Sequence, residues 1–194
     1  MLPTSCVVIR HPRVEPVSLT EVKEHLRILP ENAEDDHYVQ GLIATARRLV
    51  ESRLGITMVE TQYRAKVCGH VGCGCSCGCG GIELPNPPLL HDAEHPITIE
   101  TPTGMVEQSD FEVDGDRWPA IIKPLRGFRG PATITFWAGL RPEDESAPTL
   151  KTAIMLAVGH LYKHREAVSS DVSLIVTPMA FDALLSAESY SGRY

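Results

Sequence analysis

The order of the hydrophobic patterns constrains the fold of this chain most, because helical periodicity occurs near both ends and strand-like patterns fill the middle. Apolar residues recur at spacings of three and four over Val39–Leu54, which predicts a long amphipathic helix ending at Gly55. A second stripe, over Leu150–Leu161, predicts a helix from Ala147 to Glu166 with Pro148 in its first turn. This order predicts an α+β fold rather than regularly alternating strands and helices.

A shorter helix is predicted before the first long one, so the chain should begin with an N-terminal helix pair. Ser18 and Glu21 have the spacing of a capping box, in which each side chain satisfies a backbone N–H of the first turn. The helix is expected to end at Pro30, which cannot continue it. Its inward-facing side chains are expected to be Val22, Leu26 and Leu29.

Short segments with alternating or β-branched residues occupy the middle of the chain and predict a small antiparallel β-meander. Turns are expected at Thr103–Gly104 and Asp114–Gly115. The predicted strands are Thr57–Val67, Ile82–Leu90, Ile97–Thr101, Phe111–Val113, Ala120–Ile122 and Ala132–Ala138.

The hydrophobic pattern changes near the end of the chain. We therefore predict one domain over residues 1–168 followed by an extended C-terminal arm over 169–194. Ser169–Thr177 lacks helical periodicity, whereas Pro178–Ala187 could form a short helix. The arm carries apolar and aromatic side chains suited to a partner's groove. These candidate contact residues are Pro178, Met179, Phe181, Leu184, Leu185, Tyr190 and Tyr194. In the alternative interpretation the segment folds back and closes the core of its own subunit.

A Cys- and Gly-rich insertion over residues 68–81 is the most unusual part of the sequence. It has too little apolar volume for a core and too much glycine for a helix, so we expect a loop or hairpin tip. Its cysteines could be reduced and merely tolerated, could form disulfides, or could bind zinc together with His70. The spacing lacks the two separated knuckles of common zinc modules, so we expect no metal and no other cofactor. The zinc-ligand candidates are Cys68, His70, Cys73, Cys75, Cys77 and Cys79.

Composition narrows the functional classes. The chain has 18 basic and 25 acidic side chains and a formal net charge of −7, which disfavours tight binding to nucleic acid. The longest apolar run, Ala153–Val158, is too short to cross a bilayer, so no membrane partner is expected. No nucleophile, dinucleotide or metalloprotease motif is complete, so we expect that the protein is not an enzyme.

Several stretches, in this order, resemble the head–tail connector (adaptor) family of tailed bacteriophages and of phage-derived gene transfer agents. The first is Leu19–Arg27, which is followed by an acidic segment, Glu34–Asp36. The next are the helix Tyr38–Gly55 and the proline-rich stretch Ile82–Leu89. The closest match is Leu150–Val168, with its Gly-His-x-Tyr and Arg-Glu-Ala-Val motifs. The resemblance extends from Pro16 to Ala187, nearly the whole chain.

The resemblance implies a structural role in the neck of a virion or phage-like particle. Such adaptors form a ring, commonly dodecameric, beneath the portal protein and above a stopper or tail protein. DNA passes through the central channel without specific binding, and the parts assemble in the bacterial cytoplasm. In this setting the C-terminal arm is expected to contact the portal. The alternative is a small zinc-binding interaction protein that uses the Cys/His loop over 68–79.

Overall fold

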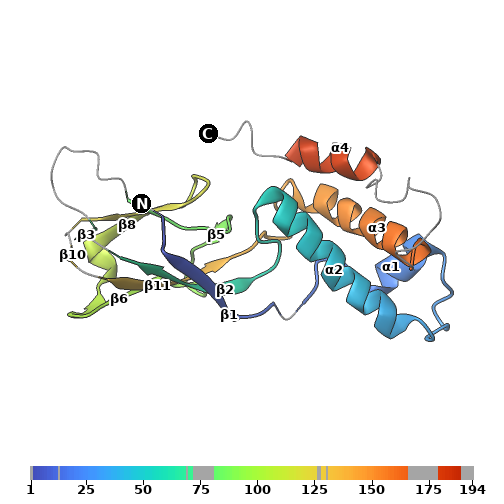
Figure 1. Cartoon of the computed structure of the whole chain (residues 1–194), viewed down its shortest axis with the longest axis horizontal. Helices are drawn as coiled ribbons and strands as arrows, with labels where there is room; N and C mark the ends of the chain where they lie inside the picture. Colours follow the sequence, from blue (N-terminus) through green and yellow to red (C-terminus); the bar gives the residue numbers. More distant parts are fainter. Residues whose placement is uncertain are drawn as a thin grey trace. The chain divides into compact units, whose positions relative to one another are not determined.

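The computed structural model describes residues 2–12, 14–68, 70–71, 81–125, 128–129, 131–165 and 179–188. The chain divides into two compact units, whose elements are labelled in Figure 1. The helical unit comprises Val14–Gly55 and Arg141–Gly192, and the sheet unit comprises Met1–Arg13, Ile56–Leu140 and Arg193–Tyr194. Whether residues 1–168 behave as one domain with 169–194 as an arm stays a prediction.

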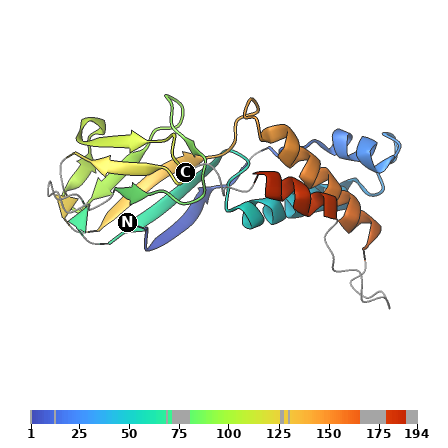
Figure 2. The same cartoon turned by 90° about the horizontal axis from the view of Figure 1, so that it is seen from above.

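The helical unit contains α1 (Leu19–Leu26), α2 (Asp36–Leu54), α3 (Ala147–Lys163) and α4 (Met179–Glu188). α2 packs on α3, and α4 packs on both, as Figure 2 shows for the teal, orange and red helices. Within the described ranges, no helix is long and apolar enough to cross a membrane. The apolar stripes predicted for α2 and α3 form the core of this unit, which includes Val39, Ile43, Ala46, Val50, Leu150, Ile154, Ala157 and Val158.

The capping box predicted at the start of α1 is confirmed, but the predicted end of this helix is wrong. The Glu21 N–H donates to Ser18 Oγ at 3.2 Å, and the Ser18 N–H donates to Glu21 Oε2 at 2.6 Å. The helix ends at Leu26 because Arg27 adopts the left-handed conformation, with φ of 59°. Leu29 therefore lies beyond the helical stripe and is 64% exposed rather than inward-facing.

The boundaries of the longer helices agree better with their sequence signals. Gly55 ends α2 in the left-handed conformation, with φ of 67°, as predicted for a glycine after the last helical turn. Pro148 lies in the first turn of α3, as predicted, because its missing N–H would have no helical partner there. α3 ends at Lys163, three residues before the predicted end at Glu166.

The sheet unit pairs strands that are distant in the sequence, so its strands do not form the meander that we predicted. One sheet has the order β1-β2-β11-β6-β7, with β5 also paired to β11; a second has the order β4-β9-β8, and β10 pairs with β3. The longer strands are β1 (Ser5–Arg10), β2 (Thr61–Val67), β6 (Thr98–Thr101), β8 (Phe111–Asp114), β9 (Ile121–Pro124) and β11 (Ala132–Ala138). The shorter ones are β3 (His70–Val71), β4 (Ile82–Glu83), β5 (Leu89–Leu90), β7 (Gly104–Val106) and β10 (Phe128–Arg129), and a 3-10 turn, η1, spans Gln108–Asp110.

Burial explains why β11 is central. In β11, Ile134 lies opposite Ala65 of β2 and Ile99 of β6, and all three are fully buried. Ile82 of β4 and Ile122 of β9 belong to the same core cluster. The two larger sheets therefore pack face to face, as in a β-sandwich, and each keeps an outer face.

Several local predictions in this unit differ from the structure. The strand predicted over Ile82–Leu90 is two short strands, β4 and β5, which pair in different sheets. The strand predicted from Thr57 begins at Thr61, and the tight turn predicted at Asp114–Gly115 is a longer connection from Gly115 to Ala120. β1 was not predicted, because Val7, Val8 and Ile9 do not alternate with polar residues. Pairing with β2 makes this segment a strand at the edge of the sheet, visible in dark blue in Figure 2.

The Cys/Gly insertion can be tested for a structural role by replacing residues 72–80 with a short Gly-Ser linker. We expect the melting temperature to stay within about 3 °C, because the core cluster is supplied by the flanking strands and loop length costs little entropy. As a contrast, Ile134→Ala should lower the melting temperature by roughly 5–15 °C, because it leaves a cavity. Unfolding of the linker variant, or loss of wild-type stability on adding a chelator, would instead identify a structural metal site.

Candidate assembly site

The acidic segment and the C-terminal motif that carry the family resemblance meet in the helical unit. Tyr162 Oη donates to Asp35 Oδ2 at 2.5 Å, and Arg165 Nη2 donates to the same oxygen at 2.8 Å. Asp35 is the N-cap residue of α2, Tyr162 lies in the last turn of α3, and Arg165 follows that helix. One carboxylate therefore ties the start of α2 to the end of α3.

Aromatic rings complete this cluster. The Arg165 guanidinium carbon lies 4.8 Å from the ring centroid of Tyr38 and 4.5 Å from that of Tyr162, so the cation contacts both π faces. The hydrogen bond from Tyr162, with that from Arg165, lowers the pKa of the Asp35 carboxyl below its ordinary value. The same bond to Asp35 raises the pKa of Tyr162. The cluster therefore favours an ionised Asp35 and a protonated Tyr162.

Lys23, in the Leu19–Arg27 stretch, holds the connection between α1 and α2. Its ammonium group donates to Pro30 O at 2.9 Å, to Asn32 O at 2.7 Å and to Asp36 Oδ1 at 2.8 Å. The residue is only 5% exposed, so these three acceptors replace most of its hydration. This role of Lys23 is not predictable from the sequence, because nothing in the local pattern distinguishes Lys23 from a solvated lysine.

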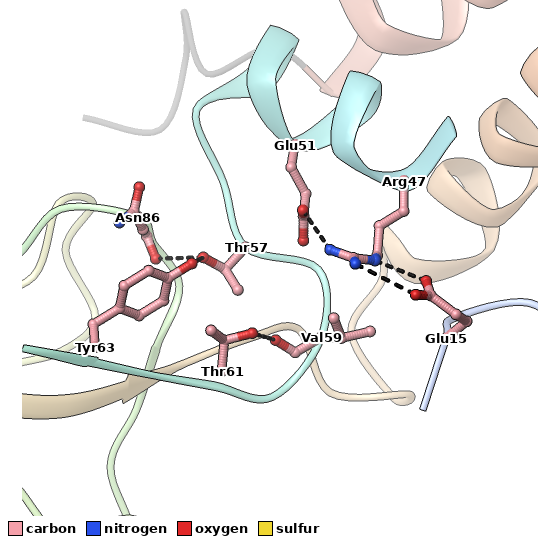
Figure 3. Close-up of polar contacts among 8 residues, drawn as sticks. All are labelled: Glu15, Arg47, Glu51, Thr57, Val59, Thr61, Tyr63 and Asn86. Atoms are coloured by element: carbon pink, nitrogen blue, oxygen red, sulfur yellow. Dashed lines mark hydrogen bonds and ion pairs between the residues drawn. The ribbon is translucent and has the colours of Figure 1, made fainter. Parts of the chain in front are cut away.

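Arg47 is a second buried cation, and Figure 3 shows its two carboxylate partners. Its Nε donates to Glu15 Oε2 at 2.7 Å, and its Nη1 donates to Glu51 Oε2 at 2.7 Å. Burial by itself would lower the pKa of Arg47, but the two carboxylates outweigh burial and raise it. A signal was present in the sequence, since Arg47 lies four residues after Ile43 and three before Val50, on the buried stripe of α2.

The proline-rich stretch fastens the two segments by which the chain enters and leaves the sheet unit. The Thr57 N–H donates to Pro87 O at 2.7 Å, and the Gly139 N–H donates to Pro88 O at 3.0 Å. Thr57 Oγ1 also donates to Asn86 O at 3.2 Å and lies 3.0 Å from Tyr63 Oη (Figure 3). Thr57 and Gly139 lie next to the boundaries of this unit, so the stretch acts as a clamp on both.

The predicted partner-contact residues fall into separate groups. Phe181 is 0% and Leu185 6% exposed within the helical unit, so these two side chains hold α4 on its own subunit. Leu184 is half-buried, and Met179 begins α4. Pro178, Tyr190 and Tyr194 lie outside the described residues. Contact of this segment with a portal stays a prediction.

The zinc-ligand candidates are mostly outside the described part of the chain. Cys68 is exposed and free, and His70 lies in β3. Cys73, Cys75, Cys77 and Cys79 are not among the described residues. In the ranges that are described, no group of three or more Cys, His, Asp or Glu side chains could hold a metal ion. The expectation that no metal binds therefore stays a prediction.

Comparisons with known proteins agree with the resemblance. A family model described as "Phage gp6-like head-tail connector protein" matches residues 16–71. No curated protein matches the chain. One similar solved structure is described as "Virion of native gene transfer agent (GTA) particle", with 17% identity, a TM-score of 0.69, and coverage of 98% of this chain and 100% of that one. Another, "Neck of empty GTA particle computed with C6 symmetry", has 16% identity, a TM-score of 0.71 and the same coverage.

These matches confirm the predicted resemblance to head–tail connectors and the predicted α+β fold class. The family model covers α1, α2 and β2, where Lys23, Asp35 and Arg47 make the contacts described above. The structural matches extend over nearly the whole chain, but at this identity they show the fold alone.

Lys23→Met tests whether the buried ammonium group stabilises the helical unit. We expect the free energy of unfolding to fall by about 2–4 kcal/mol, because the substitution leaves the two carbonyls and Asp36 without their donor. Denaturant unfolding followed by circular dichroism measures the change. Lys163→Met, at an exposed position of α3, is the matched control and should have little effect. Equal stability of the two variants would contradict this role for Lys23.

The lowered pKa of the Asp35 carboxyl predicts that the stability of the fold depends on pH. Its pKa is lower in the folded chain than in the unfolded chain, so its contribution is present above the unfolded pKa of about 3.9 and is lost as the pH falls through the folded value. Tyr162→Phe removes the largest cause of the lowered pKa. Thermal unfolding should therefore distinguish Tyr162→Phe from wild type at neutral pH more strongly than below pH about 3. A difference that is constant with pH would show that Tyr162 acts only through packing.

Proposed function

We propose that this chain is a structural head–tail adaptor of a tailed phage or of a gene transfer agent. In this proposal, copies of it form a dodecameric ring, the common state of such adaptors, beneath the portal and join the head to the tail. The observation that carries the proposal is the structural match over 98% of this chain and 100% of a chain from a particle neck. The connector family model over residues 16–71 supports it independently.

The chemistry of the described residues supports a structural role. The buried cations Lys23 and Arg47 are engaged by carboxylates or carbonyls that hold loops and helices together. The Asp35 cluster likewise joins two helices. Charged groups that are buried and paired in this way position the loops and helix ends that they contact. We therefore propose that the protein is not an enzyme and works without a cofactor.

The proposal assigns a partner to each end of the ring and a passage to its centre. The portal lies above the ring, a stopper or tail protein lies below it, and DNA passes through without specific binding. The net charge of −7 supports this last assignment, because attraction to many phosphates would slow the passage of DNA. The protein resides in the neck of the particle and assembles in the bacterial cytoplasm.

Within the C-terminal segment, we propose a division of labour. Phe181 and Leu185 position α4 by packing in the helical unit, since both are buried there. The portal contact then belongs to the remaining candidates, among which Tyr190 and Tyr194 have the side chains that most often dominate protein interfaces.

A double variant, Tyr190→Ala with Tyr194→Ala, tests the proposed contact without disturbing the buried face of α4. We expect a folded protein whose affinity for the portal of its own particle falls at least about tenfold. Binding can be measured by interferometry, and negative-stain microscopy of wild-type protein with the portal should show a ring on one end of it. Phe181→Ala is the contrasting variant and should instead lower the melting temperature.

The outcomes distinguish an error in the assigned contact residues from an error in the proposed function. Full-strength binding by the tyrosine variant would place the portal contact elsewhere in the chain. Wild-type protein that never forms a ring on the portal would overturn the adaptor function itself. Stoichiometric zinc in the purified protein, with a discrete monomer or dimer in place of a ring, would favour the small zinc-binding protein instead.

A further inference from the structure

The outer face of the larger sheet carries a group of cations. Residues directly opposite each other in a sheet share a face, and Arg64 and Lys66 of β2 lie opposite Thr135 and Thr133 of β11. Because the intervening Ala65 is fully buried in the core, Arg64 and Lys66 point outward, and both are exposed.

β1 extends this basic face. Arg10 lies opposite Gln62, on the same side of the sheet as Arg64, and its guanidinium carbon is 5.4 Å from the Trp137 ring centroid. No ion pair joins Arg10, Arg64 or Lys66 to another residue in the described ranges. Glu100 of β6, opposite Thr133, is a carboxylate on this face. Grouped cations of this kind are notable in a chain whose net charge is −7.

The outer face of the smaller sheet has the opposite character. Ile82, Val113 and Ile122 share its inner side, where Ile82 and Ile122 are fully buried. The residues that alternate with them lie on the other side of the sheet. They are Glu83, Glu112, Asp114 and Lys123, together with Ile121, which lies between Glu83 and Asp114 and is only 8% exposed. Lys123 Nζ is 3.2 Å from Asp114 Oδ2, which leaves Glu83 and Glu112 as the acidic groups of this face.

Because the two sheets pack on one core, their outer faces lie on opposite sides of the sandwich. The basic face consists of Arg10, Arg64 and Lys66, and the acidic face consists of Glu83 and Glu112, beside the Asp114–Lys123 pair. We infer that the basic face of one copy docks on the acidic face of the next copy, so that sheet units follow one another head to tail. Closure of this series into a ring rests on the proposed function.

Symmetry and charge select a second copy as the occupant. A two-fold contact would put like charges opposite each other, whereas a head-to-tail contact puts the basic face against the acidic face. Head-to-tail contacts are also the kind that close into rings. Duplex DNA is the competing occupant of a basic face, but the acidic remainder of the chain would repel it.

The charges would set orientation and register more than binding strength, because exposed ion pairs stabilise by little. Apolar side chains on the basic face could supply the binding strength. Val7 lies opposite Arg64 and is 54% exposed, and Met105 lies opposite Glu100 and is 63% exposed. Burying these two side chains against a neighbour would remove apolar surface from water.

Paired charge reversals on the full-length chain test the inference by sedimentation velocity at low salt. Wild-type protein should self-associate with rising concentration. R64E/K66E and E83K/E112K should each weaken this association at least about tenfold, because each makes both faces alike in sign. An equimolar mixture of the two variants should restore association, and so should the quadruple variant, whose faces are exchanged in sign. R48E/K163E, at exposed positions of the helical unit, changes the net charge as much as R64E/K66E does and should have little effect.

Other results would overturn the inference. These are wild-type protein that stays monomeric at about 0.5 mM, charge variants that associate like wild type, or a mixture that fails to recover. Loss of duplex-DNA binding by R64E/K66E with unchanged self-association would assign the basic face to nucleic acid instead. Portal binding is scored separately: rings that form on the portal from R64E/K66E as readily as from wild type leave the adaptor function standing while this inference fails.

Discussion

The antiparallel pairing of β2 with β11 is the constraint on which the rest of the structure depends. The helical unit is built from two parts of the chain, Val14–Gly55 and Arg141–Gly192, and Ile56–Leu140, the largest part of the sheet unit, is inserted between them. Opposite Thr61, near the start of the insertion, lies Ala138, near its end. The pairing therefore brings the two ends of a long insertion together. Interactions within the sheet unit offset the entropic cost of closing that loop. The clamp of Pro87 and Pro88 on Thr57 and Gly139 reinforces the same two points.

Once the two parts of the helical unit are together, polar contacts set how they fit. Tyr162 and Arg165 reach Asp35 across more than a hundred residues of sequence, while Lys23 and Arg47 hold the chain around α1 and α2. These residues belong to the stretches that resemble head–tail connectors. Their chemistry in this chain is that of a scaffold, in which each charge is used to position backbone or helix ends. In the proposed adaptor function, the chain would meet its partners through its surfaces.

Those surfaces differ between the two units. In the helical unit, α4 covers α2 and α3 through Phe181 and Leu185, so its most apolar side chains are already used inside the subunit. In the sheet unit, the sandwich keeps opposite charges on its two outer faces, and β1 leaves Val7, Val8 and Ile9 exposed at an edge. Exposed apolar residues on an edge strand are available for contact with another chain.

Local pattern in the sequence determined the helices, the capping box at Ser18, the glycine end at Gly55 and the alternation of β11, because each of these depends on neighbours within a few residues. It also carried the resemblance to head–tail connectors. The end of α1, the order of the strands and the existence of β1 were decided by tertiary structure, since Arg27 turns out of the helix and β1 is a strand only by pairing with β2. The same holds for the site: Lys23, Asp35 and Tyr162 are ordinary residues in the sequence, and only burial and long-range contact give each its partner. A charge pattern spread over four strands cannot be seen along the chain, because strand pairing and register decide which face of which sheet each side chain occupies.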